Sequence, residues 1–521
     1  MNVGIHVRRS ALWFADRTAI IQEHRRFTYR EFNERVNRLA NALLSLGMRK
    51  GDRVALLSPN RHQILEGEYA GLKAGLVRVP LNARLSLPEL IHMLDNSESS
   101  ALILGPEFVP QVESQRSRIQ TVKHFVAISG NPGPMIDYED LLAQGSPEEP
   151  KVEVEMDDPA SLNYTSGTSG VLKAAVTTHR NRICLAKKNL LIPGLDIAPD
   201  SVMAHVGPVT HASGAFSLPF IMRGGCNLIL KGFDIPLLLE TIEKERVTHL
   251  FLVPTMINMI VAHPDLKKHD LSSLRTINYG ASPMPPERIK QALQVFGPVL
   301  IQAYGQTETT SKITYLSKED HLLALGGDPR KARRLASAGI PIIECEVRVV
   351  NEDGEDVKPG EIGEIIERGD DTMMGYWKAP ELTAQTLRNG WVYTRDMARV
   401  DEDGYIYIVD RKSDMIISGG FNIYPSEVEN VLQSHPAVFE AAVVAIPDDY
   451  WGEAVKAVVV LNAEASATEE ELIEHCRKHL ASYKKPKSVD FVQELPKNPY
   501  GKIVRRKVKE KYWEGRDRMV H

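Results

Sequence analysis

Apolar residues recur at helical spacing near the start of the chain. Thr28 and Glu31 match a capping box, in which a threonine and a glutamate three residues later satisfy each other's backbone N–H groups. The apolar residues behind them are three and four positions apart until Gly47, so we expect one helix there. A continuously apolar run, 54–57, then predicts a buried strand that ends before Pro59.

Short apolar runs and helical patterns alternate over the first 300 residues or so. The spacing at 235–245 is one example of a helical pattern. Strands that alternate with helices favour stacked α/β layers with largely parallel sheets. The further runs that predict strands are 102–104, 125–128, 202–205, 228–230, 250–253 and 299–302.

The pattern changes after about residue 336. Short apolar runs are now separated by turn sequences such as N-E-D-G and D-E-D-G, which predicts a small β-rich subdomain over 337–410. The polar run 410–414 follows it, and we place a domain boundary there, with a hinge at 412–413. This gives a large N-terminal domain of layered α/β subdomains over 1–410. The predicted strands of the β-rich subdomain are 342–350, 363–368 and 404–409.

Residues 411–521 predict a small, mobile α+β C-terminal domain. Ser426 with Glu429, and Thr468 with Glu471, match capping boxes and predict two helix starts. We interpret the basic stretch 505–518 as a solvated helix end, with a docking patch as the alternative. The fold class expected overall is multidomain α/β. The runs that predict strands in the C-terminal domain are 438–446, 454–461 and 488–492.

Composition narrows the class of protein. The chain has 521 residues, too many for one ordinary core, and its content of 43% hydrophobic and 25% charged residues is typical of a soluble globular protein. A net charge of -5 gives no bulk electrostatic reason to bind nucleic acid or an anionic membrane. The four cysteines are far apart and predict reduced thiols. With neither a signal-peptide pattern nor a membrane-length apolar run, we expect a cytoplasmic protein without an integral membrane segment.

A glycine-rich stretch at 164–175, Y-T-S-G-T-S-G-V-L-K-A-A, carries the first candidate chemistry. Small residues let a loop backbone approach a ligand closely, and successive N–H groups and hydroxyls form a concave donor surface that suits a polyphosphate. Lys173 adds one mobile positive charge. The spacing G-x-x-G-x-x-K differs from a Walker A loop. A solvated linker is the alternative.

Two segments combine small and polar residues at the ends of apolar runs. At 278–283, N-Y-G-A-S-P, a planar ring could lie on the backbone; an ordinary strand-to-helix turn is the alternative. At 302–309, Q-A-Y-G-Q-T-E-T, Tyr304 could stack on a base. Glu308 could hold Mg²⁺, since this ion favours one or two carboxylates together with phosphate oxygens. A capped helix start is the alternative there.

Three further segments lie nearer the C-terminus. At 390–396, Asp396 could accept both ribose hydroxyls, or it could lie in a surface turn. After Arg411, the paired glycines of 418–425 could flank a narrow ligand channel or close a turn. Lys502 is on a loop rich in proline and glycine. A loop lysine is normally solvated, and we keep that interpretation for Lys497.

Taken together and in this order, the six segments resemble the acyl-adenylate-forming superfamily, which includes acyl- and aryl-CoA synthetases, amino-acid adenylation domains and beetle luciferases. The resemblance covers about residues 5–510. It implies a mobile C-terminal domain and a two-step reaction. A carboxylate and MgATP first give acyl-adenylate and pyrophosphate. The C-terminal domain then turns, and the thiol of CoA attacks the acyl carbon and releases AMP.

The resemblance implies roles for individual residues. Lys502 matches the lysine that bridges the carboxylate and the α-phosphate, Glu308 matches the Mg²⁺ contact, and Asp396 matches the ribose-binding aspartate. The residues expected to be catalytic are Lys502, Thr165, Lys173 and Glu308. Those expected to bind ATP or AMP are Thr165, Ser166, Gly167, Thr168, Ser169, Gly170, Lys173, Gly280, Ala281, Ser282, Tyr304, Gly305, Thr307, Asp396, Arg411 and Lys502.

The acyl site is expected near 208–214, P-V-T-H-A-S-G, where His211 would gate or contact the carboxylate. A packed, hydrogen-bonded histidine is the alternative. Amino-acid adenylation domains normally offer an aspartate in this region, and 210–220 contains none, which favours a fatty or aromatic acid without an α-amine. The residues expected to line the acyl pocket are His211, Ala212, Gly214, Phe216 and Gly280. Those expected on the CoA side are Gly419, Gly420 and Phe421.

Three positions depart from the pattern of the family. Its phosphate loop usually contains T-T-G-x-P-K-G, whereas Leu172 stands here in place of the proline and Ala174 in place of the last glycine. We therefore expect a somewhat different loop shape. Ser413 stands where the family usually has Asp or Lys at the hinge, which leaves the identity of the pivot open.

The leading hypothesis is an ATP-dependent acid–CoA ligase of fatty-acid or lipid metabolism that uses Mg²⁺, ATP and coenzyme A. The alternatives are a stand-alone adenylation enzyme that loads a carrier protein, and a protein of this family that binds nucleotide without turnover. The expected partners are a small carboxylic acid, ATP and CoA, with no nucleic acid. A homodimer is one assembly that the sequence leaves open.

Overall fold

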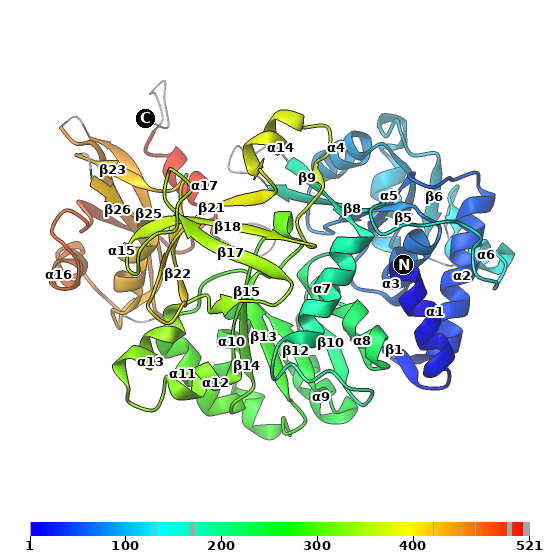
Figure 1. The fold of residues 1–521 in the computed structure, drawn as a ribbon, viewed down its shortest axis with the longest axis horizontal. Helices are drawn as coiled ribbons and strands as arrows, with labels where there is room; N and C mark the ends of the chain where they lie inside the picture. Colours follow the sequence, from blue (N-terminus) through cyan, green and yellow to red (C-terminus); the bar gives the residue numbers. More distant parts are fainter. Residues whose placement is uncertain are drawn as a thin grey trace. The chain divides into compact units, whose positions relative to one another are not determined.

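The computed structural model describes residues 2–128, 130, 132–166, 172–419, 421–448, 450–463, 465–497 and 503–513. The chain divides into two compact units, whose elements are labelled in Figure 1. The first unit contains residues 1–347 and 366–394, and the second contains 348–365 and 395–521. The domain boundary and hinge expected from the sequence at 410–413 stay predictions.

A nine-stranded sheet in the first unit has the order β16-β15-β14-β13-β12-β10-β11-β1-β2. Its central strands, from β14 to β1, are all parallel. Such strands need crossover connections, which are helices here, as the alternating pattern predicts. The strands are β1 (Thr18–Gln22), β2 (Arg25–Thr28), β10 (Val202–His205), β11 (Cys226–Ile229), β12 (His249–Leu252), β13 (Thr276–Gly280), β14 (Leu300–Tyr304), β15 (Thr314–Leu316) and β16 (Ile340–Pro341).

An eight-stranded sheet in the same unit has the order β19-β9-β8-β4-β3-β5-β6-β7. Its β8–β9 and β9–β19 pairs are antiparallel, and these three strands carry much of the candidate site. The strands are β3 (Arg53–Leu57), β4 (Val77–Leu81), β5 (Ser99–Leu104), β6 (His124–Ala127), β7 (Ile136–Asp137), β8 (Pro159–Ser166), β9 (Leu172–Thr178) and β19 (Gly375–Tyr376).

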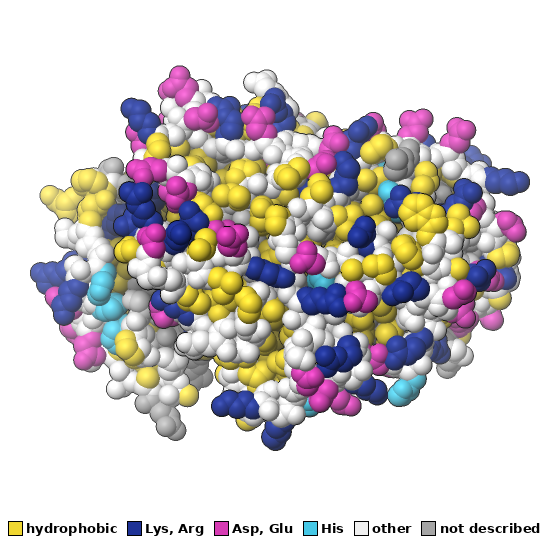
Figure 2. All heavy atoms as spheres, turned by 60° about the horizontal axis from the view of Figure 1, so that its bottom comes forward, with side chains coloured by type: hydrophobic (Ala, Val, Ile, Leu, Met, Phe, Trp, Pro, Cys, Tyr) yellow, Lys and Arg dark blue, Asp and Glu magenta, His cyan; other side chains and the backbone are white. Residues whose placement is uncertain are grey.

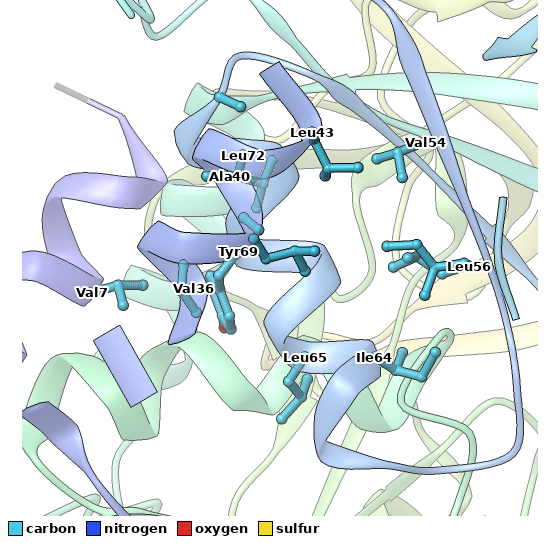
Figure 3. Packing of buried hydrophobic residues seen from close by; sticks show 14 of the residues in the cluster. Val7, Val36, Ala40, Leu43, Val54, Leu56, Ile64, Leu65, Tyr69 and Leu72 are labelled. Carbon is cyan, nitrogen blue, oxygen red and sulfur yellow. The ribbon is translucent and has the colours of Figure 1, made fainter. Parts of the chain in front are cut away.

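The largest hydrophobic cluster joins the first helices to the eight-stranded sheet. Val36 and Leu43 of α2 pack with Tyr69 of α3 and with Leu56 of β3, all fully buried (Figure 3). Burying a large apolar side chain stabilises a fold by about 1.5–3 kcal/mol. The α-helices of the first unit are α1 (Val3–Trp13), α2 (Tyr29–Ser45), α3 (His62–Lys73), α4 (Leu87–Ser97), α5 (Val109–Glu113), α6 (Tyr138–Gln144), α7 (His179–Leu191), α8 (Ser217–Arg223), α9 (Ile235–Glu245), α10 (Pro254–Val261), α11 (Pro286–Phe296), α12 (Lys318–Leu323), α13 (Pro329–Arg333) and α14 (Pro380–Thr386).

Two five-stranded sheets complete the architecture. In one, β22 pairs with β21, and the rest follow the order β17-β18-β21-β20; in the other, β27 pairs with β26, and the rest follow the order β24-β23-β26-β25. Their strands are β17 (Cys345–Val350), β18 (Ile362–Gly369), β20 (Leu387–Arg388), β21 (Trp391–Val400), β22 (Ile406–Arg411), β23 (Ile416–Ser418), β24 (Phe421–Ile423), β25 (Val438–Asp448), β26 (Gly452–Leu461) and β27 (Ser488–Phe491). The α-helices between and after the last strands are α15 (Pro425–Gln433), α16 (Glu469–His479) and α17 (Arg505–Glu510).

The α/β fold class and most predicted elements are confirmed. Thr28 caps α2 and Thr468 caps α16, each within a capping box. The cap predicted at Ser426 is wrong, because α15 already begins at Pro425, which places Ser426 in its first turn. The Ser426 N–H donates to Asp410 Oδ2 at 2.7 Å instead of closing a capping box.

None of the helices in the described ranges is long and apolar enough to cross a membrane. On the face drawn in Figure 2, basic and acidic side chains are interspersed, with hydrophobic side chains between them. The low net charge of -5 fits this mixture.

Candidate active site

The β8–β9 hairpin carries the glycine-rich stretch at its end. Thr165 is paired in register with Lys173, so their side chains lie on the same face of the hairpin. The Thr165 hydroxyl is buried, and no described residue forms a hydrogen bond with it. A threonine hydroxyl and a lysine ammonium therefore share the base of this loop. The loop residues Gly167, Thr168, Ser169 and Gly170 lie outside the described part of the chain, as does the side chain of Ser166.

Lys173 and Glu308 are brought together with a third residue, Tyr376. The Lys173 Nζ lies 3.0 Å from Glu308 Oε1. It also donates to the Tyr376 hydroxyl at 2.5 Å, and that hydroxyl donates to the same Glu308 oxygen at 2.5 Å. The ammonium also lies 4.2 Å from the centroid of the Tyr376 ring. The result is a closed triangle of charge-assisted hydrogen bonds, which are stronger than neutral ones.

Glu308 is buried, with 6% of its surface exposed, yet it is ionised at neutral pH. Burial by itself would raise the pKa of its carboxyl, but the Lys173 ammonium and the Tyr376 hydroxyl outweigh that effect, and the pKa is lowered overall. An ionised carboxylate with little access to water is a suitable donor for a hard cation. Glu308 therefore fits the Mg²⁺ contact that the resemblance implies.

Tyr376 was missed by the sequence analysis. It lies in β19, where it is paired in register with Ala175 of β9, close to Lys173 along the chain. In addition, the Met373 N–H donates to the carbonyl of Glu308 at 2.9 Å. The segment that precedes Tyr376 therefore fastens Glu308 to the strand that carries Lys173. The sequence around it, G-Y-W at 375–377, gives no sign of a site, and its partner Glu308 is 68 residues away.

The two predicted adenine-side segments emerge from neighbouring parallel strands. Gly280 at the end of β13 is paired in register with Ala303 of β14, and Tyr304 follows directly. A Cβ atom on Gly280 would lie 2.3 Å from the Ala303 carbonyl oxygen, and one on Gly305 would lie 1.6 Å from that of Ser311. The glycines therefore allow the backbones to pass closely. Ligands bind preferentially at the carboxyl ends of parallel strands. Ala281 and Ser282 continue from Gly280, and Thr307 lies with Glu308 in the 3-10 turn Thr307–Thr309.

The predicted acyl segment is the 3-10 turn Ala212–Phe216, which His211 precedes. A Cβ atom on Gly214 would lie 1.9 Å from the Val209 carbonyl oxygen, so the tight turn requires glycine. The His211 side chain is accessible, yet protein surrounds it closely enough that desolvation, followed by the charge of Arg78, lowers its pKa to about 4. His211 is therefore neutral at pH 7, whereas Phe216 is buried.

In the second unit, Asp396 and Arg411 are register partners on the antiparallel strands β21 and β22. The Arg411 Nε lies 3.2 Å from Asp396 Oδ1, and Asp396 is 5% exposed. The pairing fixes the carboxylate in one direction. A buried carboxylate that an arginine holds in one orientation is placed to accept hydroxyl donors.

The predicted CoA-side residues lie near exposed aromatic rings of the same unit. Gly419 has φ +56, and a Cβ atom there would lie 2.4 Å from the Trp451 ring. Phe421 is 53% exposed and stacks on Tyr483 with ring centroids 4.8 Å apart. Gly420 and Lys502 lie outside the described residues, so their predicted roles rest on the sequence.

Arg505 corrects one interpretation of the basic stretch. It is not a solvated residue at a helix end, because its guanidinium bonds to Asp410 at 2.9 Å, Asp414 at 3.1 Å and Glu429 at 2.5 Å. These carboxylates raise its pKa although burial alone would lower it. Arg505 therefore fastens residues on both sides of the predicted hinge to α15.

Comparison with known proteins places these residues in a family. Residues 7–377 match the model of the AMP-binding enzyme, and residues 427–502 match that of the AMP-binding enzyme C-terminal domain. The chain belongs to the AMP-binding enzyme family. The predicted membership of the acyl-adenylate-forming superfamily is thereby confirmed.

Two curated relatives and one solved structure cover nearly all of this AMP-binding enzyme. A feruloyl-CoA synthase from Amycolatopsis sp is 41% identical over 500 residues, which are 95% of this chain and 96% of that protein. The medium/long-chain-fatty-acid–CoA ligase FadD8 of Mycobacterium tuberculosis is 36% identical over 509 residues, covering 95% and 87%. The anthranilate CoA ligase AuaEII in complex with anthranoyl-AMP has a TM-score of 0.88 at 28% identity, covering 98% and 97%. These names agree with the predicted class of AMP-forming acid–CoA ligase.

A second group of possible metal ligands in this AMP-binding enzyme has a different explanation. Among the described residues, ligand atoms of Cys345, Glu367 and Asp371 lie within 4.8 Å of one another. Asp371, however, pairs with the buried ammonium of Lys188. Burial, and then the neighbouring Asp371 carboxylate, raise the pKa of Glu367, so Glu367 holds a proton at neutral pH. A protonated carboxyl beside an existing ion pair does not need a metal ion to balance its charge.

Proposed function

We propose that this enzyme is an AMP-forming acid–CoA ligase that works in two steps. A carboxylate oxygen of the acid first attacks the α-phosphorus of ATP, and the bond to the pyrophosphate oxygen breaks. The CoA sulfur then attacks the acyl carbon, the bond to the AMP oxygen breaks, and the thiol proton is released. The observation that carries this proposal is the contact of Lys173 with Glu308 and Tyr376 in a chain of the AMP-binding family.

The triangle of Lys173, Glu308 and Tyr376 is suited to receive a magnesium-bound triphosphate. Separating a buried ion pair normally leaves two uncompensated charges and is strongly unfavourable. A triphosphate would supply a negative partner for Lys173, and Mg²⁺ would supply a positive one for Glu308. The bound ion would neutralise phosphate charge, and the Thr165 hydroxyl would offer a further contact. The exchange therefore keeps every buried charge paired.

The remaining nucleotide contacts follow the positions of their elements. Gly280, Ala281 and Ser282, with Tyr304 and Gly305, would hold the adenine, while Thr307 would contact a phosphate. Asp396, oriented by Arg411, would accept the ribose hydroxyls. Lys502 would bridge the carboxylate and the α-phosphate, because a positive charge aimed at both partners lowers the repulsion between two anions. A movement of the C-terminal domain about 412–413 would then bring Gly419, Gly420 and Phe421 to the thiol.

The acid is expected to be fatty or aromatic. His211 is neutral at pH 7, and the turn that carries Ala212, Gly214 and Phe216 offers no carboxylate to an α-amine. The names of the relatives divide between an aromatic acid and medium/long-chain fatty acids, and they therefore support both classes. The dependence on ATP and CoA, and the four free cysteines, favour a reducing, cytoplasmic setting.

The test is a panel of aliphatic C2–C18 and aromatic acids, assayed for pyrophosphate release with MgATP and then for products with CoA added. We expect pyrophosphate, AMP and an acyl-CoA thioester with at least one class of acid. An acyl-adenylate that persists with CoA and is consumed only by a holo-carrier protein would reject the ligase in favour of a carrier-loading enzyme. Nucleotide binding without pyrophosphate release from any acid would reject both.

A further inference from the structure

A buried ammonium lies against the acyl segment of the first unit. Lys312 is 4% exposed, and its Nζ is 4.4 Å from the centroid of the Phe216 ring. The ammonium donates one hydrogen bond, to Asn189 Oδ1 at 2.8 Å. No carboxylate of the described residues lies within ion-pair distance of it. A lysine has three donors, so this buried cation has less compensation than its chemistry requires.

The neighbouring buried lysine shows how such a charge is normally satisfied. Lys188 on α7 is fully buried, and it pairs with the equally buried Asp371. It also donates to the carbonyl oxygen of Lys312 at 3.3 Å. Asp371 therefore balances the charge of Lys188, and the Lys188 ammonium lies next to Lys312. Desolvation, followed by the charge of Lys188, lowers the pKa of Lys312 to about 7.

A second unsatisfied polar group lies on the same side of the nine-stranded sheet. Asn278 on β13 is 1% exposed, and neither its amide oxygen nor its amide nitrogen has a hydrogen-bond partner among the described residues. It is the register partner of Phe251, so the two side chains share a face of the sheet. The Phe251 ring packs on the Phe216 ring with centroids 5.5 Å apart. Lys312 and Asn278 therefore flank one pair of aromatic rings.

The unsatisfied groups of Lys312 and Asn278 indicate which polar group the acyl part of the substrate carries. We propose that Lys312 and Asn278 select an aromatic acid that carries a ring hydroxyl, with Lys312 donating a hydrogen bond to the hydroxyl oxygen and the Asn278 amide completing its contacts. A hydroxyl is both donor and acceptor, which matches a site that offers an ammonium and an amide. Phe216 and Phe251 supply faces for the aromatic ring. The inference rests on the proposed function, and it narrows the substrate from a fatty or aromatic acid to a hydroxylated aromatic acid.

A fatty acid would not meet these requirements. Its chain has no polar atom, so Lys312 and Asn278 would stay buried and unsatisfied in the complex. A site built to hydrogen-bond a substrate hydroxyl discriminates strongly against an analogue that lacks it, because the buried partners are then left unpaired. The same argument predicts weaker use of an aromatic acid without the hydroxyl.

The experiment compares kcat/KM for 4-hydroxycinnamate, cinnamate and decanoate by pyrophosphate release, in the full-length enzyme and two variants. We expect the enzyme to prefer 4-hydroxycinnamate over cinnamate by about 10- to 100-fold, the range for one hydrogen bond to a charged group. Lys312→Met should remove most of this preference while retaining turnover of cinnamate. Asn278→Leu should reduce it as well, and this variant gives up no hydrogen bond of the described structure.

Lys318→Met is the matched control, because Lys318 also makes one hydrogen bond to an oxygen, at 2.7 Å, but to the backbone of Arg275 away from Phe216. It should keep the full preference. Equal use of the two cinnamates by the unaltered enzyme, or an unchanged ratio in both Lys312→Met and Asn278→Leu, would overturn the inference and leave the ligase proposal standing. Absence of pyrophosphate release from every acid would instead overturn the proposed function.

Discussion

At the proposed phosphate site of the first unit, Lys173 and Glu308 satisfy each other through Tyr376. At the proposed acyl site, the Lys312 ammonium contacts an amide oxygen and an aromatic ring, and Asn278 has no described partner. Both regions bury charged or polar groups within one compact unit. They differ in whether the protein itself completes the contacts of those groups.

The difference follows what each region is proposed to bind. ATP and Mg²⁺ would be the same in every turnover, and together they carry both negative and positive charge. The Lys173–Glu308 ion pair can therefore separate to bind them without leaving either side chain with an unpaired charge. The acid, by contrast, differs between possible substrates, and it offers only the polar groups of its own acyl part. Lys312 and Asn278 therefore select among acids, because an acid that leaves them without hydrogen-bond partners binds less favourably.

The largest effect should come from removing Lys502. Lys502→Ala should slow adenylation by roughly 10²–10³-fold, the loss typical of one preorganised electrostatic donor. Thioester formation from supplied acyl-adenylate should persist. Lys497→Ala is the control, because Lys497 is exposed and pairs with Glu440 at 2.8 Å, and its removal should change neither step. An equal fall of both half-reactions in Lys502→Ala would contradict the two-step account.

Breaking the phosphate-side triangle should have a smaller effect. Tyr376→Phe keeps the ring under the Lys173 ammonium but removes the hydroxyl that links Lys173 to Glu308. We expect kcat/KM for MgATP to fall by about tenfold, the loss of one charge-assisted hydrogen bond. Tyr164→Phe on β8 removes a hydroxyl that bonds to Asn96 and to the Met93 carbonyl, both uncharged, and should leave MgATP kinetics unchanged. Equal effects of the two substitutions would show that Tyr376 has no specific role.

The second unit offers a test in which no buried charge is involved. Gly419→Ala should lower the free energy of unfolding by about 1–2 kcal/mol, because φ is +56 and the new methyl group would overlap the Trp451 ring. Gly404→Ala has a similar strain, at φ +84, but meets nothing within 4 Å. Denaturation followed by tryptophan fluorescence should show the larger loss for Gly419→Ala. The reverse order would contradict the packing described at Gly419.

A separate test concerns the pH dependence of stability. The pKa of Lys312 falls from 10.5 to about 7 on folding, so between these values the unfolded chain binds the extra proton and the free energy of unfolding rises with pH. Its described charged neighbour is Lys188, and Phe216 and Asn189 face it from the other elements. The Lys312→Met variant should lack this rise. The free energy of unfolding of the unaltered enzyme, minus that of the variant, should therefore increase from pH 7 to 10. A difference that is constant from pH 7 to 10 would show that Lys312 is not a desolvated ammonium.

Much of the fold follows from local pattern. The capping boxes at Thr28 and Thr468 appear where the spacing predicts them, and the apolar runs become the strands of two largely parallel sheets. Such signals are local because a cap or a strand is decided by a few neighbouring residues. Ser426 failed for a related reason: Pro425 fixes the start of the helix one residue earlier, and the distant Asp410 takes the Ser426 N–H.

The site could be predicted only in part. Gly280 and Gly305 lie against carbonyl oxygens where a side chain would clash, while the ring contact predicted at 278–283 stays a prediction. Tyr376, Asn278 and Lys312 could not be found, because their significance depends on partners in other elements, or on the lack of them. A lysine in a sequence gives no sign of whether a carboxylate will be folded against it.

Acyl-adenylate formation is tested most directly by an acid labelled with ¹⁸O in both carboxylate oxygens, incubated with MgATP and CoA. Attack on the α-phosphorus makes one carboxylate oxygen the bridge between acyl group and phosphate, and thiolysis leaves that oxygen on the nucleotide. The account predicts AMP that carries one ¹⁸O and an acyl-CoA that keeps the other. ADP as the nucleotide product, with the label in inorganic phosphate, would contradict it.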